Sequence, residues 1–394
     1  MICTQSGMIG AVAARFANPF TFGDLALDEA FTDREAELDA LEADLRNGRN
    51  VALIAPRRYG KTSLLRRAAQ HLVAEGILVA EVDLMKAASK ERFAAQLART
   101  IHDDLASVLY RAKEALAVFG SLRITPTVTL NPKDSSYSFT FSTGRAEPED
   151  VDATIERLLE LPAQLAAEQG KRVVVCFDEF QEVTAIDPRL PALMRAVFQE
   201  QPDVAHVYAG SRRDMMNRLF NDENEPFYRS AKVMEIGPIP PELFERFVRE
   251  RFDATERGIA DAAVEGLLAV TRGHPYATQE LAYALWEQVP HGFTASVADL
   301  EAALASVLRS ENARFTLLWD TLSRAQRALL LALTAEPGHV LSAGFRDRHG
   351  LPAASTIQRA AEALANAELI GRRADGASEV VEPFLAEWLE RNAT

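Results

Sequence analysis

Five short runs of mostly apolar residues, each separated from the next by helical sequence, constrain the fold of this chain most strongly. The runs are NVALIA, ILVAEVDL, KRVVVCFDEF, AHVYAGS and AKVMEIG, at residues 50–55, 77–84, 171–180, 205–211 and 231–237. Apolar strands of this kind are typical of a parallel sheet that is covered on both faces. Strands that alternate with helices need crossover connections. We therefore expect an α/β fold with a parallel sheet and crossover helices.

The first run leads into a loop and then a helix, in NVALIAPRRYGKTSLLRRAAQHL. It nearly fits the phosphate-loop pattern G-x-x-x-x-G-K-[ST], in which the N–H groups and the lysine hold phosphates and the hydroxyl holds Mg²⁺. Ala55 replaces the first glycine, at the strand exit, where a methyl group intrudes less than it would at Gly60. The alternative is a lysine-bearing turn without a ligand. The expected nucleotide-binding loop consists of Ala55, Pro56, Arg57, Arg58, Tyr59, Gly60, Lys61, Thr62 and Ser63, with Lys61 also catalytic and Thr62 on the metal.

Two adjacent acids end the third run, VVVCFDEF. Neighbouring carboxylates at the tip of an apolar strand are costly to bury without a cation. We expect Asp178 to hold Mg²⁺ through water and Glu179 to orient and activate an attacking water. The alternative is a pair of acids in a solvated loop. Together with the phosphate loop, the two acids predict a site for ATP or ADP with Mg²⁺.

The rest of the chain indicates further parts. SLRITPTVTLNPKDSSYSFTFSTG alternates β-branched or aromatic residues with polar ones, which predicts an inserted hairpin and a surface suited to assembly. After GPIPP the strands stop and the sequence is helical, and from Ser323 it indicates a winged helix. The predicted domains are an N-terminal arm (1–20), a P-loop nucleotide-binding core (21–237, with the hairpin at about 121–143), a helical lid (238–318) and a winged-helix domain (319–394).

Composition excludes several classes of protein. The net charge of −14 argues against a chain whose whole surface is built to hold nucleic acid. Two cysteines, Cys3 and Cys176, cannot form a disulfide framework, which indicates a reducing compartment. The sequence has no apolar run of about eighteen residues to span a membrane, and its start lacks the basic region of a signal peptide. We expect a cytoplasmic protein.

With these motifs in this order, the chain from about Asn18 onward resembles the archaeal-type ATPase family of the STAND and AAA+ P-loop NTPases. The motifs that carry the resemblance are NPF, FTDREAELDAL, APRRYGKTSLL, CFDEFQ, YAGSRRDMM, PFYRSAKVMEIGPI, GHPY and EPFLAEWL. The resemblance implies an AAA+-like P-loop core followed by a helical lid and a C-terminal winged helix. It also implies an ATP hydrolase that uses Mg²⁺.

The resemblance assigns roles to residues beyond the loop and the two acids. Arg34 matches the family's hhGRExE motif, which approaches the nucleotide, although Asp33 stands where glycine is usual. In GHPY, Pro275 would lie near the adenine and His274 would sense the phosphates, unless His274 only caps a helix. Ser211 matches the polar residue that reads the γ-phosphate, with a helix N-cap as the alternative.

Three arginines are candidates for stabilising charge in the transition state: Arg212, Arg213 and Arg229. Among them we place Arg229 in the catalytic set, beside Glu179, Lys61 and Ser211. A surface ion pair is the alternative use for each.

The predicted winged helix does not have the charge of a DNA reader. Residues 323–394 hold eight arginines, no lysine and nine acids, so packing as a regulatory lid is favoured over DNA binding. Arg372 and Arg373 keep DNA binding open as an alternative.

The leading function is a Mg²⁺-dependent ATPase that acts as a nucleotide-controlled switch. ATP would hold the lid and winged helix against the core, and hydrolysis would release them. The alternatives are a DNA-binding AAA+ ATPase of the origin-recognition kind and a non-catalytic nucleotide-binding adaptor. We expect a protein partner, which the sequence does not identify, and a homo-oligomer formed with nucleotide stays open.

Overall fold

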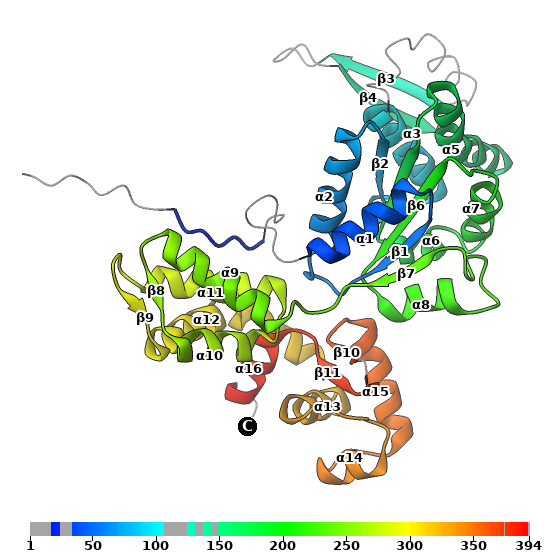
Figure 1. The fold of residues 1–394 in the computed structure, drawn as a ribbon. Helices are drawn as coiled ribbons and strands as arrows, with labels where there is room; N and C mark the ends of the chain where they lie inside the picture. The colour runs from blue at the N-terminus through cyan, green and yellow to red at the C-terminus, as the bar shows by residue number, and fades with distance from the viewer. Residues whose placement is uncertain are drawn as a thin grey trace, which may run out of the picture. The chain divides into compact units, whose positions relative to one another are not determined.

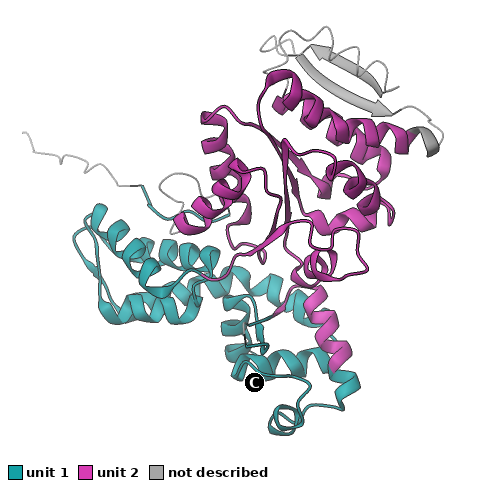
Figure 2. Ribbon diagram, turned by 45° about the vertical axis from the view of Figure 1, so that its right-hand side comes forward, with its two compact units in different colours: residues 1–32, 239–357, 372–394 teal, residues 33–238, 358–371 magenta. Residues whose placement is uncertain are grey.

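The computed structural model describes residues 17–23, 34–105, 124–130, 137–143, 148–373 and 375–392. These residues form two compact units (Figure 2). Unit 2 takes in the described residues of 33–238 and 358–371, and unit 1 those of 1–32, 239–357 and 372–394. Each unit has its own architecture.

Unit 2 is built on a five-stranded parallel sheet with the strand order β2-β5-β6-β1-β7. Within it, Ile54 at the end of β1 is in register with Gly210 at the end of β6, and Asp83 of β2 with Asp178 of β5. The carboxyl ends of β5, β6 and β1 therefore lie in a row at one edge of the sheet. The predicted parallel sheet is confirmed, with strands β1 (Val51–Ile54), β2 (Leu78–Asp83), β5 (Val173–Asp178), β6 (Val204–Gly210) and β7 (Lys232–Glu235).

Helices cover both faces of this sheet (Figure 1). The chain crosses from β1 out to the edge strand β2 and then returns, and right-handed crossovers in opposite directions lie on opposite faces. On one face, α1 (Glu35–Arg46) packs against α2 (Lys61–Ala74). On the other, α5 (Pro148–Gln169) packs against both α3 (Lys90–Leu105) and α7 (Leu190–Phe198). Helix α8 (Arg213–Asn221) follows β6, while η2 (Leu84–Lys86) follows β2, and η3 (Phe180–Glu182) and α6 (Val183–Ile186) follow β5.

An aromatic cluster supports the carboxyl ends of β5 and β6. Phe180, the residue after the two predicted acids, is fully buried, and its ring centroid lies 4.7 Å from that of Tyr208 and 5.2 Å from that of Phe227. Aromatic rings at these separations pack favourably. The side chain of Phe180 therefore anchors the turn that follows β5.

The inserted hairpin is present as β3 (Ile124–Leu130) and β4 (Tyr137–Thr143), which pair antiparallel, as predicted. Its Asn-Pro-Lys-Asp turn lies outside the described residues. Asp33 of the hhGRExE motif also lies outside them.

Unit 1 is mainly helical, with α9 (Pro241–Ala254), α10 (Asp261–Thr271), α11 (Pro275–Gln288) and α12 (Val297–Thr321). Phe20 packs into it, with its ring centroid 5.6 Å from that of Phe252 and with 1% of its surface exposed. The predicted N-terminal arm (1–20) is corrected here, because its last residue belongs to the core of unit 1, and residues 1–16 lie outside the described part of the chain.

Two short strands correct the expectation that strands stop after GPIPP. β8 (Gly258–Ile259) and β9 (Thr294–Ala295) pair parallel, because the connections before α10 and before α12 lie side by side. Two residues are too few to show the alternation by which a strand is recognised in a sequence.

The C-terminal part contains three helices, two short strands and a last helix, in keeping with the predicted winged helix. Its elements are α13 (Arg324–Ala335), α14 (Ala343–Arg348), α15 (Ala354–Asn366), β10 (Ile370–Arg372), β11 (Ser378–Val380) and α16 (Pro383–Asn392). Helix α12 continues across the predicted boundary between residues 318 and 319. In the described parts of the chain, no helix is both long enough and apolar enough to cross a membrane.

Candidate nucleotide-binding site

The loop between β1 and α2 holds a backbone conformation that depends on glycine. Gly60 is the N-cap of α2 and has φ +85° and ψ 13°, in the left-handed region that favours glycine. The first N–H groups of a helix have no partner inside the helix, and Gly60 has no side chain to cap them. The start of α2 therefore offers donors to an anion.

The beginning of the loop is tied to the neighbouring strand β6. Ala55 is completely buried, and its N–H donates to the carbonyl of Gly210 at 3.1 Å. The Tyr59 N–H donates to the Pro56 carbonyl at 3.3 Å, which closes the turn. A small side chain at position 55 thus fits the strand exit, as expected from the departure from the pattern.

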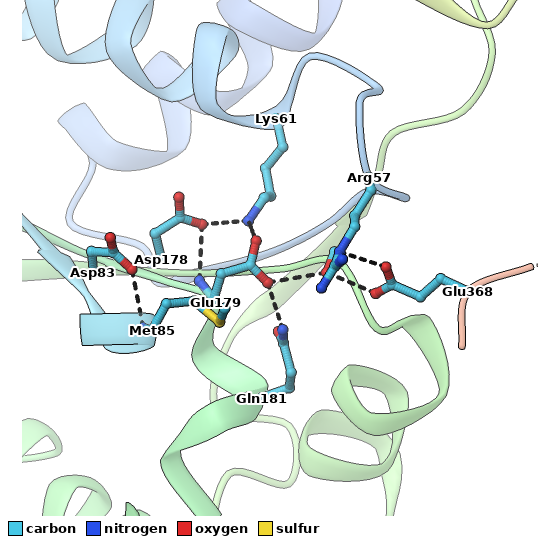
Figure 3. A network of polar contacts seen from close by, with 9 residues as sticks. Arg57, Lys61, Asp83, Met85, Asp178, Glu179, Gln181 and Glu368 are labelled. Carbon is cyan, nitrogen blue, oxygen red and sulfur yellow. Dashed lines mark hydrogen bonds and ion pairs between the residues drawn. The ribbon is translucent and has the colours of Figure 1, made fainter. Parts of the chain in front are cut away.

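Lys61 and the two acids come together at the edge of the sheet (Figure 3). The side chain of Lys61 is only 7% exposed, and its Nζ pairs with Asp178 Oδ1 and lies 2.8 Å from Glu179 Oε1. These side chains come from α2 and from the end of β5. A buried ammonium group between two carboxylates at a helix start is an arrangement that can exchange one of its anions for a phosphate.

Glu179 is held by four polar groups. Its backbone has φ +53°, and its N–H donates to Asp178 Oδ1 at 2.9 Å. Oε2 accepts from Gln181 Nε2 at 2.5 Å and from Ser211 Oγ at 3.0 Å, while Oε1 faces Lys61. Burial alone would raise the pKa of Glu179, but the charge of Lys61 and the hydrogen bonds from Lys61, Gln181 and Ser211 outweigh it and lower the pKa. The carboxylate is therefore ionised, which a base requires.

Ser211 lies directly after β6, between the strand ends that carry the loop and the acids. Its Oγ is 3.0 Å from Glu179 Oε2 and also 3.0 Å from Glu368 Oε1. A hydroxyl donates a single proton, so the two carboxylates share one donor. Ser211 is not the N-cap of α8, since that position is Arg212.

A contact that sequence reasoning missed joins the loop to residues 358–371 of unit 2. Arg57 Nε lies 2.6 Å from Glu368 Oε2, although two thirds of the Arg57 side chain (66%) is exposed. Arg212 Nη2 donates to Asn366 Oδ1 at 3.5 Å on the same segment. Glu368 itself has φ +58°, a conformation uncommon for glutamate. No sequence pattern marks such a pairing.

Arg34 forms hydrogen bonds to the phosphate loop and to the chain after β7. Its guanidinium donates to the Gly237 carbonyl at 2.6 Å, to the Tyr59 carbonyl at 3.4 Å and to Glu37 Oε1 at 2.9 Å. The side chain is buried. The predicted residue therefore lies next to the phosphate loop, where it links the loop to Gly237, two residues after β7.

Of three further predicted residues, one precedes β7 and two belong to unit 1. Arg229 is exposed and precedes β7, which begins beside Val51 at the start of β1. It thus lies at the opposite edge of the sheet from the acids, so the structure does not bring it together with Lys61, Asp178 and Glu179. His274 and Pro275 belong to unit 1, where His274 Nδ1 accepts from the Ala277 N–H at 3.2 Å and caps α11.

The donor set fits Mg²⁺ that arrives with a nucleotide. Thr62 is the second residue of α2, Ser63 follows it, and Asp178 ends β5. Among the described residues, no group of three or more His, Cys, Asp or Glu side chains could hold a metal ion by itself. Mg²⁺ is commonly bound by one or two protein oxygens together with phosphates and water.

The comparisons with known proteins agree with this fold. Residues 31–281 match the family model of an ATPase domain predominantly from Archaea, and residues 313–391 match a probable winged helix domain. A Walker-type ATPase of Pyrococcus abyssi has a similar structure, with a TM-score of 0.63 and 18% identity, over 93% of this chain and 97% of that one. The curated proteins contain no match.

Two further solved structures are more distant. The ORC1 protein of Aeropyrum pernix, in complex with DNA, has a TM-score of 0.46 and 14% identity, over 93% of this chain and 94% of that one. The RuvB Holliday junction branch migration motor of Thermotoga maritima has a TM-score of 0.43 and 15% identity, over 93% and 96%. At 18% identity, the likeness to the Pyrococcus abyssi ATPase shows the fold alone. The family model, which spans more than half of the chain and contains the phosphate loop and both acids, shows that the chain belongs to the P-loop ATPases whose domain occurs predominantly in Archaea.

Proposed function

We propose that this chain binds ATP with Mg²⁺ and hydrolyses it. The observation that carries the proposal is the contact of the buried Lys61 ammonium with both Asp178 and Glu179 at the start of α2. The ammonium group and the free N–H groups of the helix start suit the β- and γ-phosphates. Thr62 and Asp178 would hold Mg²⁺, which neutralises charge on the phosphate oxygens.

Glu179 has the properties of the group that activates water. It is ionised, it is held by Gln181 and Ser211, and it lies beside the lysine that would contact the γ-phosphate. A positioned base commonly contributes about 100-fold to 10,000-fold in rate. Ser211, whose Oγ contacts this base, would also contact the phosphate that is cleaved.

The test is the turnover of Glu179→Gln. We expect ATP affinity to stay within about threefold of wild type and phosphate release to fall roughly 100-fold or more. Glu81→Gln is the matched control, because Glu81 is a half-buried carboxylate on the edge strand β2 whose pKa is raised by burial. Normal turnover in Glu179→Gln, or an equal loss in Glu81→Gln, would contradict the role of Glu179.

We further propose that nucleotide controls the segment 358–371. Glu368 contacts Arg57 and Ser211, two of the residues assigned to the phosphate end of the site. Its carboxylate would therefore compete with the γ-phosphate for the same donors. From the sequence we expected ATP to hold the C-terminal part against the core and hydrolysis to release it, but this contact favours the reverse. ATP would release the segment 358–371, and loss of the γ-phosphate would let Glu368 return.

Glu368→Gln tests this competition. Removing the charge should tighten the binding of ATP several-fold and change the binding of ADP less than twofold, since ADP has no γ-phosphate to compete. Glu362→Gln is the control, because Glu362 lies on α15, shortly before Glu368, and its Oε1 accepts from Gln358 Nε2 at 3.0 Å. Hydrogen exchange should show residues 358–371 less protected with a non-hydrolysable ATP analogue than with ADP. Greater protection with the ATP analogue would contradict this proposal and would support the expectation that ATP holds the segment.

A further inference from the structure

Gln181 is a buried amide that the proposed chemistry does not yet use. The residue is 1% exposed, and its Nε2 donates to Glu179 Oε2 at 2.5 Å. Its Oε1 is buried and has no hydrogen-bond partner among the described residues. The amide orientation follows from the carboxylate, since the opposite orientation would place two acceptors against each other.

The surroundings of this amide are built to hold it. Gln181 lies in η3, directly after Phe180, whose ring is anchored in the aromatic cluster. A Cβ atom added at Gly210 would lie 2.5 Å from Gln181 Oε1, so only glycine at that position leaves room for the amide. The carbonyl of Gly210 also receives the N–H of Ala55. The Gln181 amide thus lies between the end of β5, which carries Asp178, and the end of β6, where Gly210 contacts the phosphate loop.

A purely structural role would be better filled by an apolar residue. An unpaired buried acceptor costs about 1 to 3 kcal/mol, and a side chain of similar shape without polar atoms would avoid that cost. What the amide adds is one donor to Glu179, on the oxygen that Ser211 also contacts.

We propose that Gln181 is a positioning residue that holds the Glu179 carboxylate in the orientation needed to activate water. The inference rests on the proposed role of Glu179. Lys61 fixes Oε1 of that carboxylate, and Gln181 fixes Oε2. Without the amide, Oε2 keeps, among the residues that the structure describes, only the hydroxyl of Ser211, which it shares with Glu368. The carboxylate can then rotate away from the reacting water.

The test compares Gln181→Met with Gln201→Met. Gln201 is the matched control: it is also buried, donates Nε2 to the Leu159 carbonyl at 2.8 Å, and has a buried Oε1 without a partner among the described residues. We expect kcat of Gln181→Met to fall about 10-fold to 100-fold, as for other small misplacements of a reacting group, with ATP affinity within about threefold. The melting temperature should stay equal or rise. Gln201→Met should keep wild-type kcat.

A double-mutant cycle with Glu179→Gln separates positioning from general damage. If Gln181 acts through Glu179, Gln181→Met should cause no further loss of turnover in the Glu179→Gln background. Additive losses, unchanged kcat in Gln181→Met, or an equal loss in Gln201→Met would each overturn the proposal. If Gln181→Met does not fold, Gln181→Leu, which also lacks the donor, is measured in its place. Loss of turnover in Glu179→Gln with normal turnover at position 181 rejects this inference alone, whereas normal turnover in Glu179→Gln rejects the proposed function.

Discussion

Two lysines in unit 2 each hold two carboxylates, yet only Lys61 lies in the proposed nucleotide site. Lys61 pairs with Asp178 and Glu179. Lys90 Nζ lies 2.6 Å from Asp152 Oδ1 and 2.9 Å from Asp187 Oδ2, with 16% of its side chain exposed. Both lysines are the first residue of a helix, α2 or α3. Neither burial, nor charge, nor position at a helix start therefore distinguishes the two clusters.

The difference lies in what the backbone leaves available. Before α3, Ser89 Oγ accepts from the Arg92 N–H at 3.3 Å, so the helix is capped by its own chain. Before α2, Gly60 offers no side chain and has φ +85°. The Lys61 acids are consecutive residues at a strand end, whereas the Lys90 acids join separate helical segments, α5 and the end of α6. The Lys90 cluster therefore joins helical segments, whereas the Lys61 cluster lies beside helix N–H groups that a ligand can use.

The largest expected effect contrasts the two lysines directly. Lys61→Ala should weaken the binding of a fluorescent ATP analogue by about 100-fold or more, because a desolvated partner of a phosphate is lost. Lys90→Ala should leave that affinity within about threefold. Equal affinities in the two variants, measured by titration, would remove the distinction drawn between the clusters.

A smaller effect should follow from changing the residue before each helix. A Cβ atom at Gly60 would meet no atom within 4 Å, so Gly60→Ala affects only the backbone conformation. A left-handed conformation costs an alanine about 1 to 2 kcal/mol, which predicts roughly tenfold weaker ATP binding. Ser89→Ala should instead lower the free energy of unfolding by about 1 kcal/mol through loss of the cap. The contrast fails if Ser89→Ala weakens ATP binding and Gly60→Ala does not.

Local motifs made the central site predictable from sequence. Gly60-Lys61-Thr62 follows one buried strand and Asp178-Glu179 ends another, and parallel strands bring their carboxyl ends to one edge. The same rule could have placed Arg229, which precedes a strand, at the other edge of the sheet.

Other contacts depend on side chains that meet only after folding. Glu368 lies far along the chain from Arg57, and no spacing or periodicity links the two. Gln181 was part of the CFDEFQ motif, but its role depends on the turn at Glu179 and on the space that Gly210 leaves. Such contacts follow from tertiary packing, which a single sequence does not reveal.

The smallest expected effect concerns the acid dependence of stability at the Lys90 cluster. The hydrogen bond from Lys90 lowers the pKa of Asp187 below its ordinary value of 3.8, against the opposing effect of burial and with help from the Arg189 backbone. A carboxyl group whose pKa is lower in the folded chain stabilises it above the ordinary value, and this contribution is lost as the pH falls through the folded pKa. At neutral pH, Asp187→Asn should therefore lower the free energy of unfolding by about 1 kcal/mol, measured by urea denaturation. Below about pH 4, the stability of this variant should fall less steeply with pH than that of wild type.

Lys90→Met is the control for this pair. It should also make stability fall less steeply at acidic pH, and Asp187→Asn should cause little further loss of stability in the Lys90→Met background, because the two residues act as one pair. Parallel stability curves for wild type and Asp187→Asn would show that the cluster does not stabilise the fold, and a loss of ATP binding in either variant would show that it does more than join helices.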